Sequence, residues 1–439
     1  MLRLIATLAV LLLSAAAFAQ DLTPRAEAPE GSVAIVGATI HTGAGRTIRS
    51  GYVLFEGGTI RDIGSGRRPF GDDARVIDAR GMHVYPGLIS ATSRLGLTEI
   101  ASVRAMRDFS EVGLVKPEVR AVVAVNPDST LLPVARTNGI LIAGTVPSGG
   151  VVPGRMGIIR LDGWTWEDMA VRQDAGLVLN WPNVRPATSG RRGSDAEAAT
   201  RRRLAEIDAL FDQAEAYHAA RSADESTPVD LVYEGMLGVL PSAEDQRPIF
   251  INASDMARIQ SAVTWAVGRG LKPIIVGGRD APKLADLLTT HDVPVIVNGT
   301  HNFPSRNDAP HDEAFTLPKR LQDAGIAWCL TSGNSDENVR NLPYEAATAV
   351  AFGLSQEYAI AAITRWPAEI LGIADAYGTL EPGKSATLLV TNGSPLEMTT
   401  TIHHAFLDGA EVDLSNKQTV LRDRYREKYR RLELIEVDP

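Results

Sequence analysis

The chain has 439 residues, of which 44% are hydrophobic and 22% are charged, a composition typical of globular proteins with a large buried core. Its formal net charge of -9 argues against nucleic acid as a partner. The length predicts one large α/β domain with a smaller appendage.

Residues 1–19 are predicted to be a signal peptide. Arg3 gives a positive start, residues 4–13 form an apolar run, and Ala17-Phe18-Ala19 offers a small-x-small cleavage site before Gln20. The apolar run is shorter than the roughly 20 residues that a bilayer crossing needs, which disfavours the alternative of a membrane anchor. We therefore expect a periplasmic or secreted protein with no membrane partner after cleavage.

Short strands bounded by turn residues are predicted near both ends of the chain. Residues 31–82 contain four of them, at 33–36, 51–56, 59–63 and 75–77. Residues 376–414 contain two more, at 386–392 and 401–412. We expect the first set to be antiparallel, and both sets to pair into one small β-sandwich domain.

The middle of the chain, residues 83–375, alternates short apolar runs with amphipathic helical patterns. Strands and helices follow one another at 248–253, 255–269, 272–278, 281–290 and 293–297, and again at 326–331 and 343–352. Such alternation predicts parallel βα units that close into a TIM-like (β/α)8 barrel, giving an α/β fold class. In that architecture the chemistry belongs at the C-terminal ends of the strands.

Two segments are predicted to be helices outside this alternation. Residues 195–221 carry one apolar stripe, Ser194 and Glu197 form a capping box before it, and residues 185–193 read as a solvated loop. Residues 415–439 form a C-terminal helix and tail, in which Leu421, Tyr425 and Tyr429 lie on one side among Arg and Lys. We expect this last helix to dock by that side.

Three motifs resemble those of the amidohydrolase superfamily, and among its branches the imidazolonepropionase-like one. Residues 76–89 read VIDARGMHVYPGLI, as at the family's entry into the first barrel strand. Residues 366–372 read WPAEILG and residues 378–384 read GTLEPGK, as at its return into the β-sandwich. The resemblance implies metal-dependent hydrolysis of non-peptide C–N bonds, usually with zinc held by histidines and an aspartate at strand ends.

Each position where the resemblance implies a metal ligand carries a different residue here. Thr92-Ser93-Arg94 stands in place of His-x-His, and Ser90 precedes it where an acidic residue is common. Asn252 replaces the fifth-strand histidine, Gly277-Gly278 ends the sixth strand, and Ser332 replaces the eighth-strand aspartate. A neutral hydroxyl, a permanent cation or a glycine is a poor zinc ligand. We therefore expect no metal and no other cofactor.

Of the remaining histidines, only His301 follows a predicted barrel strand. With Asp308, His311 and Asp312 nearby in sequence it could form an alternative metal site, although a polar loop over the barrel mouth explains it equally simply. The sole cysteine, Cys329, lies in an apolar run and is interpreted as a buried, inert thiol.

Seven polar residues at predicted strand ends are candidates for lining a pocket at the barrel mouth: Thr92, Arg94, Asn252, Arg279, His301, Ser332 and Asn334. Such a pocket could bind a small anionic or amide-bearing molecule, because Arg recognises carboxylates and Asn both donates and accepts. Alternatively, these groups satisfy one another in a collapsed mouth. Arg94 should either pair with an internal carboxylate or hold an anionic ligand, because a buried guanidinium without a partner is unfavourable.

Three functions stay open at this point. The first is a pseudoenzyme, a non-catalytic or impaired family member that binds a small molecule or pairs, as a homo- or hetero-oligomer, with an active relative. The second is an active hydrolase of C–N bonds with an atypical site around His301. The third is a structural subunit.

Overall fold

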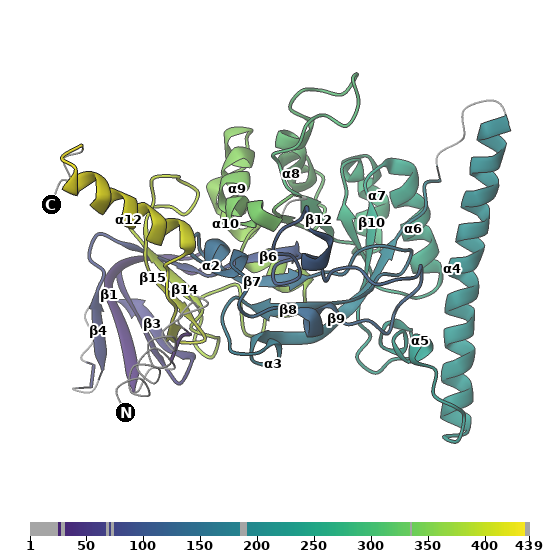
Figure 1. The fold of residues 1–439 in the computed structure, drawn as a ribbon, viewed down its shortest axis with the longest axis horizontal. Coiled ribbons are helices and arrows are strands. Elements are labelled where there is room, and N and C mark those ends of the chain that lie inside the picture. Colours follow the sequence, from purple (N-terminus) through teal and green to yellow (C-terminus); the bar gives the residue numbers. More distant parts are fainter. Residues whose placement is uncertain are drawn as a thin grey trace, which may run out of the picture.

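The computed structural model describes residues 25–27, 31–66, 70–71, 74–184, 191–333 and 336–434, with side chains for all of these except 191–196. The predicted signal peptide and Asn334 therefore lie outside the described residues. Figure 1 shows two β-sheet units side by side, a smaller one that contains β1 and β14 and a larger one flanked by helices.

The larger sheet has eight strands and forms a nearly closed, TIM-like barrel. Its strands are β6 (Leu88–Ser93), β7 (Ile140–Thr145), β8 (Gly154–Arg160), β9 (Ala170–Asn180), β10 (Ile249–Ala253), β11 (Pro273–Gly277), β12 (Val295–Asn298) and β13 (Trp328–Thr331), in that spatial order. The first and last strands meet through the Thr331 hydroxyl, whose Oγ1 lies 2.6 Å from the Thr92 carbonyl oxygen and 3.1 Å from Ser90 Oγ. This contact brings the two edges of the sheet together.

The predicted strict alternation of strand and helix is wrong for part of the barrel. Strands β9 to β13 run parallel to one another, as expected, and so do β6 and β7, but β8 is antiparallel to both β7 and β9. Between β7 and β8 the chain makes a loop with no helix, residues 146–153, which is enough for an antiparallel return but not for a parallel crossover.

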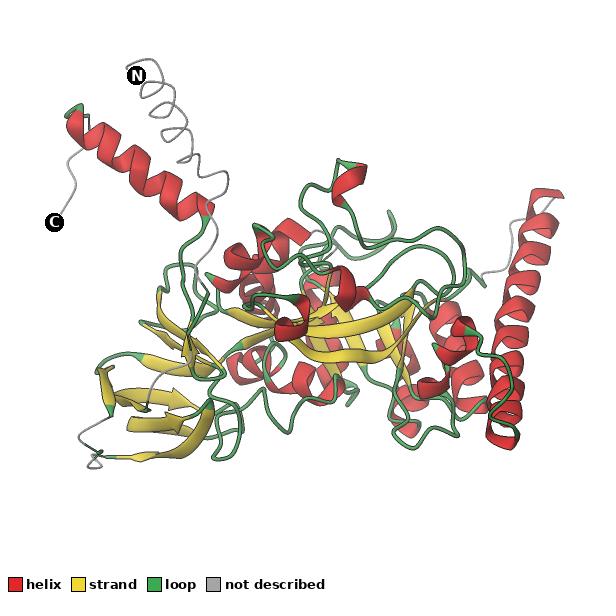
Figure 2. Ribbon diagram, turned by 60° about the horizontal axis from the view of Figure 1, so that its bottom comes forward, coloured by secondary structure: helices red, strands yellow, loops and turns green. Residues whose placement is uncertain are grey.

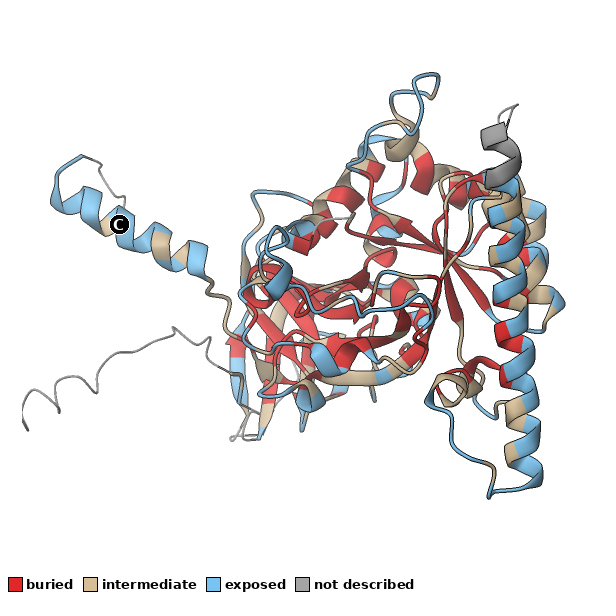
Figure 3. Cartoon of the chain, turned by 45° about the vertical axis from the view of Figure 1, so that its right-hand side comes forward, coloured by how far each residue is buried: buried red, intermediate tan, exposed pale blue. Residues whose placement is uncertain are grey.

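Helices cover the outside of this sheet. They are α2 (Leu131–Arg136), α3 (Trp166–Met169), α5 (Leu231–Glu234), α6 (Met256–Gly268), α7 (Ala285–Thr290), α8 (Glu313–Asp323), α9 (Leu342–Ala351), α10 (Gln356–Ala361) and α11 (Arg365–Ile370). Five short 3-10 helices join them: η2 (Arg104–Met106), η3 (Ala121–Ala124), η4 (Leu237–Val239), η5 (Ala281–Leu284) and η6 (Asp336–Asn341). Figure 3 shows that the barrel strands are buried inside this layer.

The long helix α4 (Arg191–Ala223) packs by the stripe that the sequence predicted. Its Ile207, Phe211 and Ala214 are buried, and the Phe211 ring meets Trp265 of α6 edge-on at 5.1 Å. The helix begins at Arg191, so residues 191–193 are helical rather than part of a loop, and the expected start at a Ser194 capping box is wrong.

The smaller sheet combines strands from both ends of the chain. They are β1 (Ser32–His41), β2 (Thr47–Glu56), β3 (Thr59–Ser65), β4 (Arg75–Asp78), β5 (His83–Pro86), β14 (Leu388–Thr391), β15 (Ile402–Leu407) and β16 (Ala410–Glu411), all linked in one hydrogen-bonded sheet. The expectation of a wholly antiparallel N-terminal set is wrong, because β4 and β5 both run parallel to β1. Strand β1 reaches both because β4 pairs with its first half and β5 with its second.

The C-terminal helix α12 (Lys417–Arg431) is not docked as expected. None of its residues is buried, Tyr425 and Tyr429 are 49% and 41% exposed, and Figures 2 and 3 show the helix extending away from the sheet. The helix has the predicted apolar side, but no described residue packs against it. No helix in the described part of the chain is both long and apolar enough to span a bilayer.

Candidate functional site

The barrel mouth contains a cavity of about 340 Å³ at the C-terminal ends of the strands. Its polar lining comes from β6, β9, β10, β12 and the segments that follow β6, β7 and β13: Thr92, Ser93, Arg94, Ser148, Asn180, Asn252, Asn298 and Asp336. Val178, Phe250 and Val276 add apolar wall. Parallel strands bring these side chains together because their C-terminal ends share one edge of the barrel.

Three of the seven residues predicted from the sequence line this cavity, namely Thr92, Arg94 and Asn252. Three others do not line it. The Ser332 hydroxyl lies 2.8 Å from the Asn338 carbonyl oxygen, and the exposed His301 ring meets Thr348 Oγ1 of α9 at 2.9 Å.

The third residue outside the cavity is Arg279, whose guanidinium lies 3.3 Å from the carboxylate of its neighbour Asp280. The seventh residue, Asn334, is outside the described residues. Of the predicted set, the described residues after β6 and β10 therefore lie at the cavity, whereas those after β11, β12 and β13 have their side chains outside it.

Three asparagines form the most distinctive part of the mouth. Asn252 Nδ2 donates to Asn180 Oδ1 at 2.7 Å, and Asn180 Nδ2 donates to the Gly150 carbonyl oxygen at 2.9 Å. This chain fixes the orientation of both amides, so that Asn252 Oδ1 is left as an acceptor. Within the described ranges neither this oxygen nor the side-chain amide of Asn298 has a hydrogen-bond partner, so both are available to a ligand.

Arg94 has an internal carboxylate partner, which was one of its two expected roles. Its Nε lies 3.3 Å from Asp336, its backbone N–H donates to the same carboxylate at 3.2 Å, and its guanidinium stacks 4.4 Å from the centre of the Phe109 ring. Asp336 is buried, whereas the Arg94 side chain is 28% exposed. The pair places one positive and one negative charge in the mouth, so Arg94 gives the cavity no net positive charge.

A buried carboxylate on α9 holds the loops that border the mouth. Glu345 Oε2 accepts from the backbone N–H of Thr300 at 2.7 Å, and its Oε1 lies 3.0 Å from the Ser332 hydroxyl and 3.4 Å from the Gly333 nitrogen. Glu345 thereby ties the segments after β12 and β13 to one helix. Sequence reasoning missed it because it lies within a helical pattern, as it missed Asp336 on η6.

Asn180 could have been found from the sequence, because it directly follows the apolar run of residues 175–179 in the same way that Asn252 follows residues 249–251. Asn298 ends β12 in the same manner. A systematic search for amides at the ends of apolar runs would have located all three.

The residues of the mouth do not fit a metal ion. The positions at which the resemblance implies ligands carry Thr92, Arg94, Asn252 and Ser332, and the described residues contain no group of three or more His, Cys, Asp or Glu side chains that could hold one. A side chain at Gly277 would be strained, because the backbone φ there is +108° and a Cβ would lie 2.4 Å from Ser254 Oγ. The alternative group around His301 is likewise not assembled.

Comparisons with known proteins agree on one kind of relative. No family model matches the chain. Amidohydrolase tasK of Hapsidospora irregularis is 23% identical over 402 residues, covering 82% of this chain and 39% of that protein. Imidazolonepropionase of Brucella suis is 28% identical over 149 residues, covering 33% of this chain and 35% of that protein. The chain thus matches well under half of the length of both relatives.

Among solved structures, an amidohydrolase from Thermotoga maritima superposes with a TM-score of 0.76 at 24% identity, covering 87% of this chain and 99% of that one. At this identity the likeness concerns the fold.

Proposed function

We propose that the chain is a member of the amidohydrolase superfamily, in its imidazolonepropionase-like branch, and that it binds a small amide-bearing molecule at the barrel mouth without hydrolysing it. The observation that carries the proposal is the pair of available amide groups, Asn252 Oδ1 and the Asn298 side chain, at strand ends inside a cavity of about 340 Å³. An amide ligand offers one donor and one acceptor, and these two asparagines offer the complementary groups.

The charge of the mouth favours a neutral ligand over an anion. Arg94 and Asp336 are the charged side chains among its lining residues, and they pair with each other at 3.3 Å. An incoming carboxylate would have to compete with Asp336 for the same guanidinium. A neutral amide needs no counter-charge, so it meets no such competition.

The lining also lacks a group suited to activating water, which supports binding without turnover. Of the described polar lining residues, only Asp336 carries a carboxylate; its Oδ1 accepts from the Arg94 side chain and backbone N–H, and its Oδ2 lies 3.3 Å from Arg94 Nε, so both oxygens lie beside a cation. Hydroxyls and amides cannot act as general bases near neutral pH without a base beside them. A true hydrolase would therefore need a catalytic group from elsewhere.

The test is a thermal-shift and calorimetric titration with 2-pyrrolidinone as the amide probe and acetate as the anionic probe. The amide should raise the midpoint of the wild type, because a ligand of the native state stabilises it by mass action. Asn252→Ala should lose most of that shift, while Asn392→Ala, in the bend that follows β14, should keep it. A shift from acetate alone, or an equal amide shift in Asn252→Ala, would contradict the proposal.

Two further parts of the proposal concern the cellular setting. Residues 1–19 support export to the periplasm or beyond, because they combine a positive start, an apolar run and a small-x-small site. The loss of the expected metal ligands supports an association with an active relative, in which this chain supplies binding rather than chemistry. Co-purification of the exported chain with a metal-containing relative tests both parts.

A further inference from the structure

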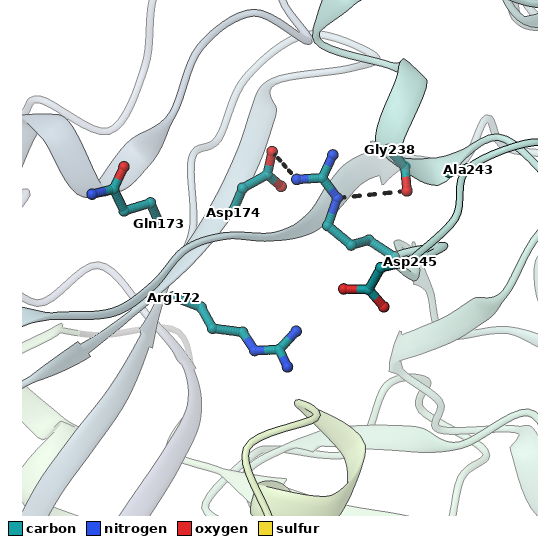
Figure 4. A pocket seen from close by; sticks show the side chains of 7 residues that line it. Arg172, Gln173, Asp174, Gly238, Ala243 and Asp245 are labelled. Atoms are coloured by element: carbon teal, nitrogen blue, oxygen red, sulfur yellow. Dashed lines mark hydrogen bonds and ion pairs between the residues drawn. The ribbon is translucent and has the colours of Figure 1, made fainter.

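A second cavity lies at the opposite end of the barrel. It has a volume of about 510 Å³ and is lined by the first residues of β9, by η4 and by the segment before β10, including Arg172, Asp174, Asp245 and Arg247 (Figure 4). Strand β9 links it to the mouth, since Arg172 and Asn180 are eight residues apart on that strand, roughly 26 Å at 3.3 Å per residue. The two cavities are therefore separate.

Arg172 stands in this second cavity without a partner. Its side chain is partly buried, and in the described part of the chain it makes no hydrogen bond or ion pair. Figure 4 shows the guanidinium reaching into the open space, and a Cβ added at Gly372 would lie only 3.8 Å from it. A guanidinium that is partly removed from water and has no counter-ion favours an anion that can bind it.

The two carboxylates near Arg172 differ in their hydrogen-bond partners. Asp174 Oδ2 receives Arg155 at 2.5 Å and Arg247 at 2.6 Å, while its Oδ1 is buried and has no hydrogen-bond donor among the described residues. Asp245 presents an exposed carboxylate on the facing wall and has no partner in the described ranges either. The cavity therefore offers one unpaired cation together with two oxygen acceptors that lack donors.

The charges favour a ligand that carries both a carboxylate and a hydrogen-bond donor. The two arginines and two aspartates that line the cavity have a formal charge of zero, and Arg155, which pairs with Asp174 from outside the lining, adds one positive charge. A plain dianion would be repelled by Asp245 and Asp174, whereas a single carboxylate can bind Arg172 through two parallel hydrogen bonds. A donor on the same molecule can then bind the exposed carboxylate of Asp245.

We propose that this cavity is a second binding site, separate from the mouth, for a small carboxylate that also carries an N–H or O–H donor, such as an α-amino acid or a hydroxy acid. Arg172 holds the carboxylate, and the exposed Asp245 accepts from the donor. Five of the seven lining residues have polar side chains, and none is aromatic, so a small polar ligand fits the cavity better than an aromatic one. Binding here leaves the asparagines of the mouth untouched.

The test uses isothermal titration and thermal shift of the full chain with glycine, glycolate and acetate at constant ionic strength. Glycine or glycolate should bind more tightly than acetate, because only these two carry the donor. Arg172→Ala should weaken that binding at least tenfold, which is the loss of about 1.4 kcal/mol expected from a charge-assisted contact. The comparison of glycine with glycolate separates an amino acid from a hydroxy acid.

Two further variants keep the result interpretable. Arg172→Lys retains the charge and removes the planar fork, so it should bind with intermediate affinity even if Arg172→Ala folds poorly. Arg104→Ala removes one exposed arginine of η2, which has no partner in the described ranges, and should bind as the wild type does.

Equal losses in Arg104→Ala and Arg172→Ala would show a general effect of charge and overturn the proposal. So would equal binding by Arg172→Ala and the wild type, or no binding of any probe to the wild type. Because Asn252→Ala alters only the mouth, it should leave glycine binding unchanged. Failure of the function proposed for the mouth would thus be seen independently of failure here.

Discussion

Glu345 should be one of the most sensitive positions near the barrel mouth, because a single buried carboxylate holds two loops. Replacing it with alanine removes the acceptor of the Thr300 N–H at 2.7 Å, a bond to a charged group worth about 1.5–3 kcal/mol. The Ser332 hydroxyl keeps the Asn338 carbonyl oxygen at 2.8 Å, and the 3.4 Å contact to Gly333 is weak, so these two add little. With roughly 1 kcal/mol for lost packing, the expected total is about 3 kcal/mol.

The assay is thermal unfolding of the wild type beside three variants. With about 2.1 cal/mol/K of unfolding entropy per residue, a chain of this size changes its midpoint by roughly 1 °C per kcal/mol, so Glu345→Ala should melt about 3 °C lower. Glu345→Gln keeps the volume and one acceptor, and should lose less than half as much.

The matched control is Glu369→Ala, which removes an exposed carboxylate 3.7 Å from Arg365 and should stay within about 0.5 kcal/mol of the wild type. A Glu345→Ala midpoint within 1 °C of the wild type would refute the reasoning. An equal loss in Glu369→Ala would do the same.

Four further outcomes are expected. Burial, and secondarily the His83 imidazole, lower the pKa of His41 to about 4. Because the unfolded chain binds this proton near pH 6.5, the contribution of His41 to stability is lost as the pH falls from about 6.5 to about 4. Over this pH range the melting midpoint should therefore fall more steeply with decreasing pH for the wild type than for His41→Gln. An equal pH dependence of the two midpoints would contradict the assignment. Complete burial raises the pKa of the Cys329 thiol, so a thiol reagent should label the native protein no faster than it unfolds. Elemental analysis after dialysis should find far less than one zinc per chain, whereas stoichiometric zinc that depends on His301 would revive the alternative site. Mass spectrometry of exported protein should give a chain that starts near Gln20, and retention of residues 1–19 would count against export.

Hydrophobic periodicity located the parallel half of the barrel closely, because each strand there is an apolar run between turn residues. The run at 248–253 became β10 (Ile249–Ala253), and the run at 326–331 became β13 (Trp328–Thr331). Strand β8, which reads GRMGIIR, is much less apolar and was not predicted, and it lies antiparallel to its neighbours. Periodicity gives the position of a strand but not its direction, which depends on the length of the connection.

The same limit explains the error at α12. The positions of Leu421, Tyr425 and Tyr429 correctly identified one apolar side of a helix. A sequence pattern cannot say what covers such a side, and in the described part of the chain nothing does. By contrast, the stripe of α4 found a partner in α6 because Trp265 presents a large ring to Phe211.

At the site, strand ends could be predicted and long-range partners could not. Asn252 was found because an amide directly follows an apolar run. The partner of Arg94 is Asp336, which lies 242 residues away on a 3-10 helix whose local sequence has no metal or catalytic pattern. The expectation that Arg94 needs a counter-charge followed from the unfavourable burial of an unpaired guanidinium, and the ion pair with Asp336 confirms it. The identity of the partner could be learned only from the structure.

The charged residues that line the mouth balance one another without a metal ion. A divalent ion adds two positive charges, so a metal-binding mouth needs an excess of anionic or strongly basic ligands around it. Here the described lining residues carry one arginine, one aspartate and three asparagines, and their formal charge is zero without any ion. The Asn252 amide is held in place by Asn180 rather than by a metal, and Gly277 is packed against Ser254 where a longer side chain would not fit. Adding a metal would therefore need Arg94 removed and Gly277 enlarged at the same time, and the second change would strain β11. The mouth is already balanced for a neutral ligand, which is the reason for expecting binding there in place of hydrolysis.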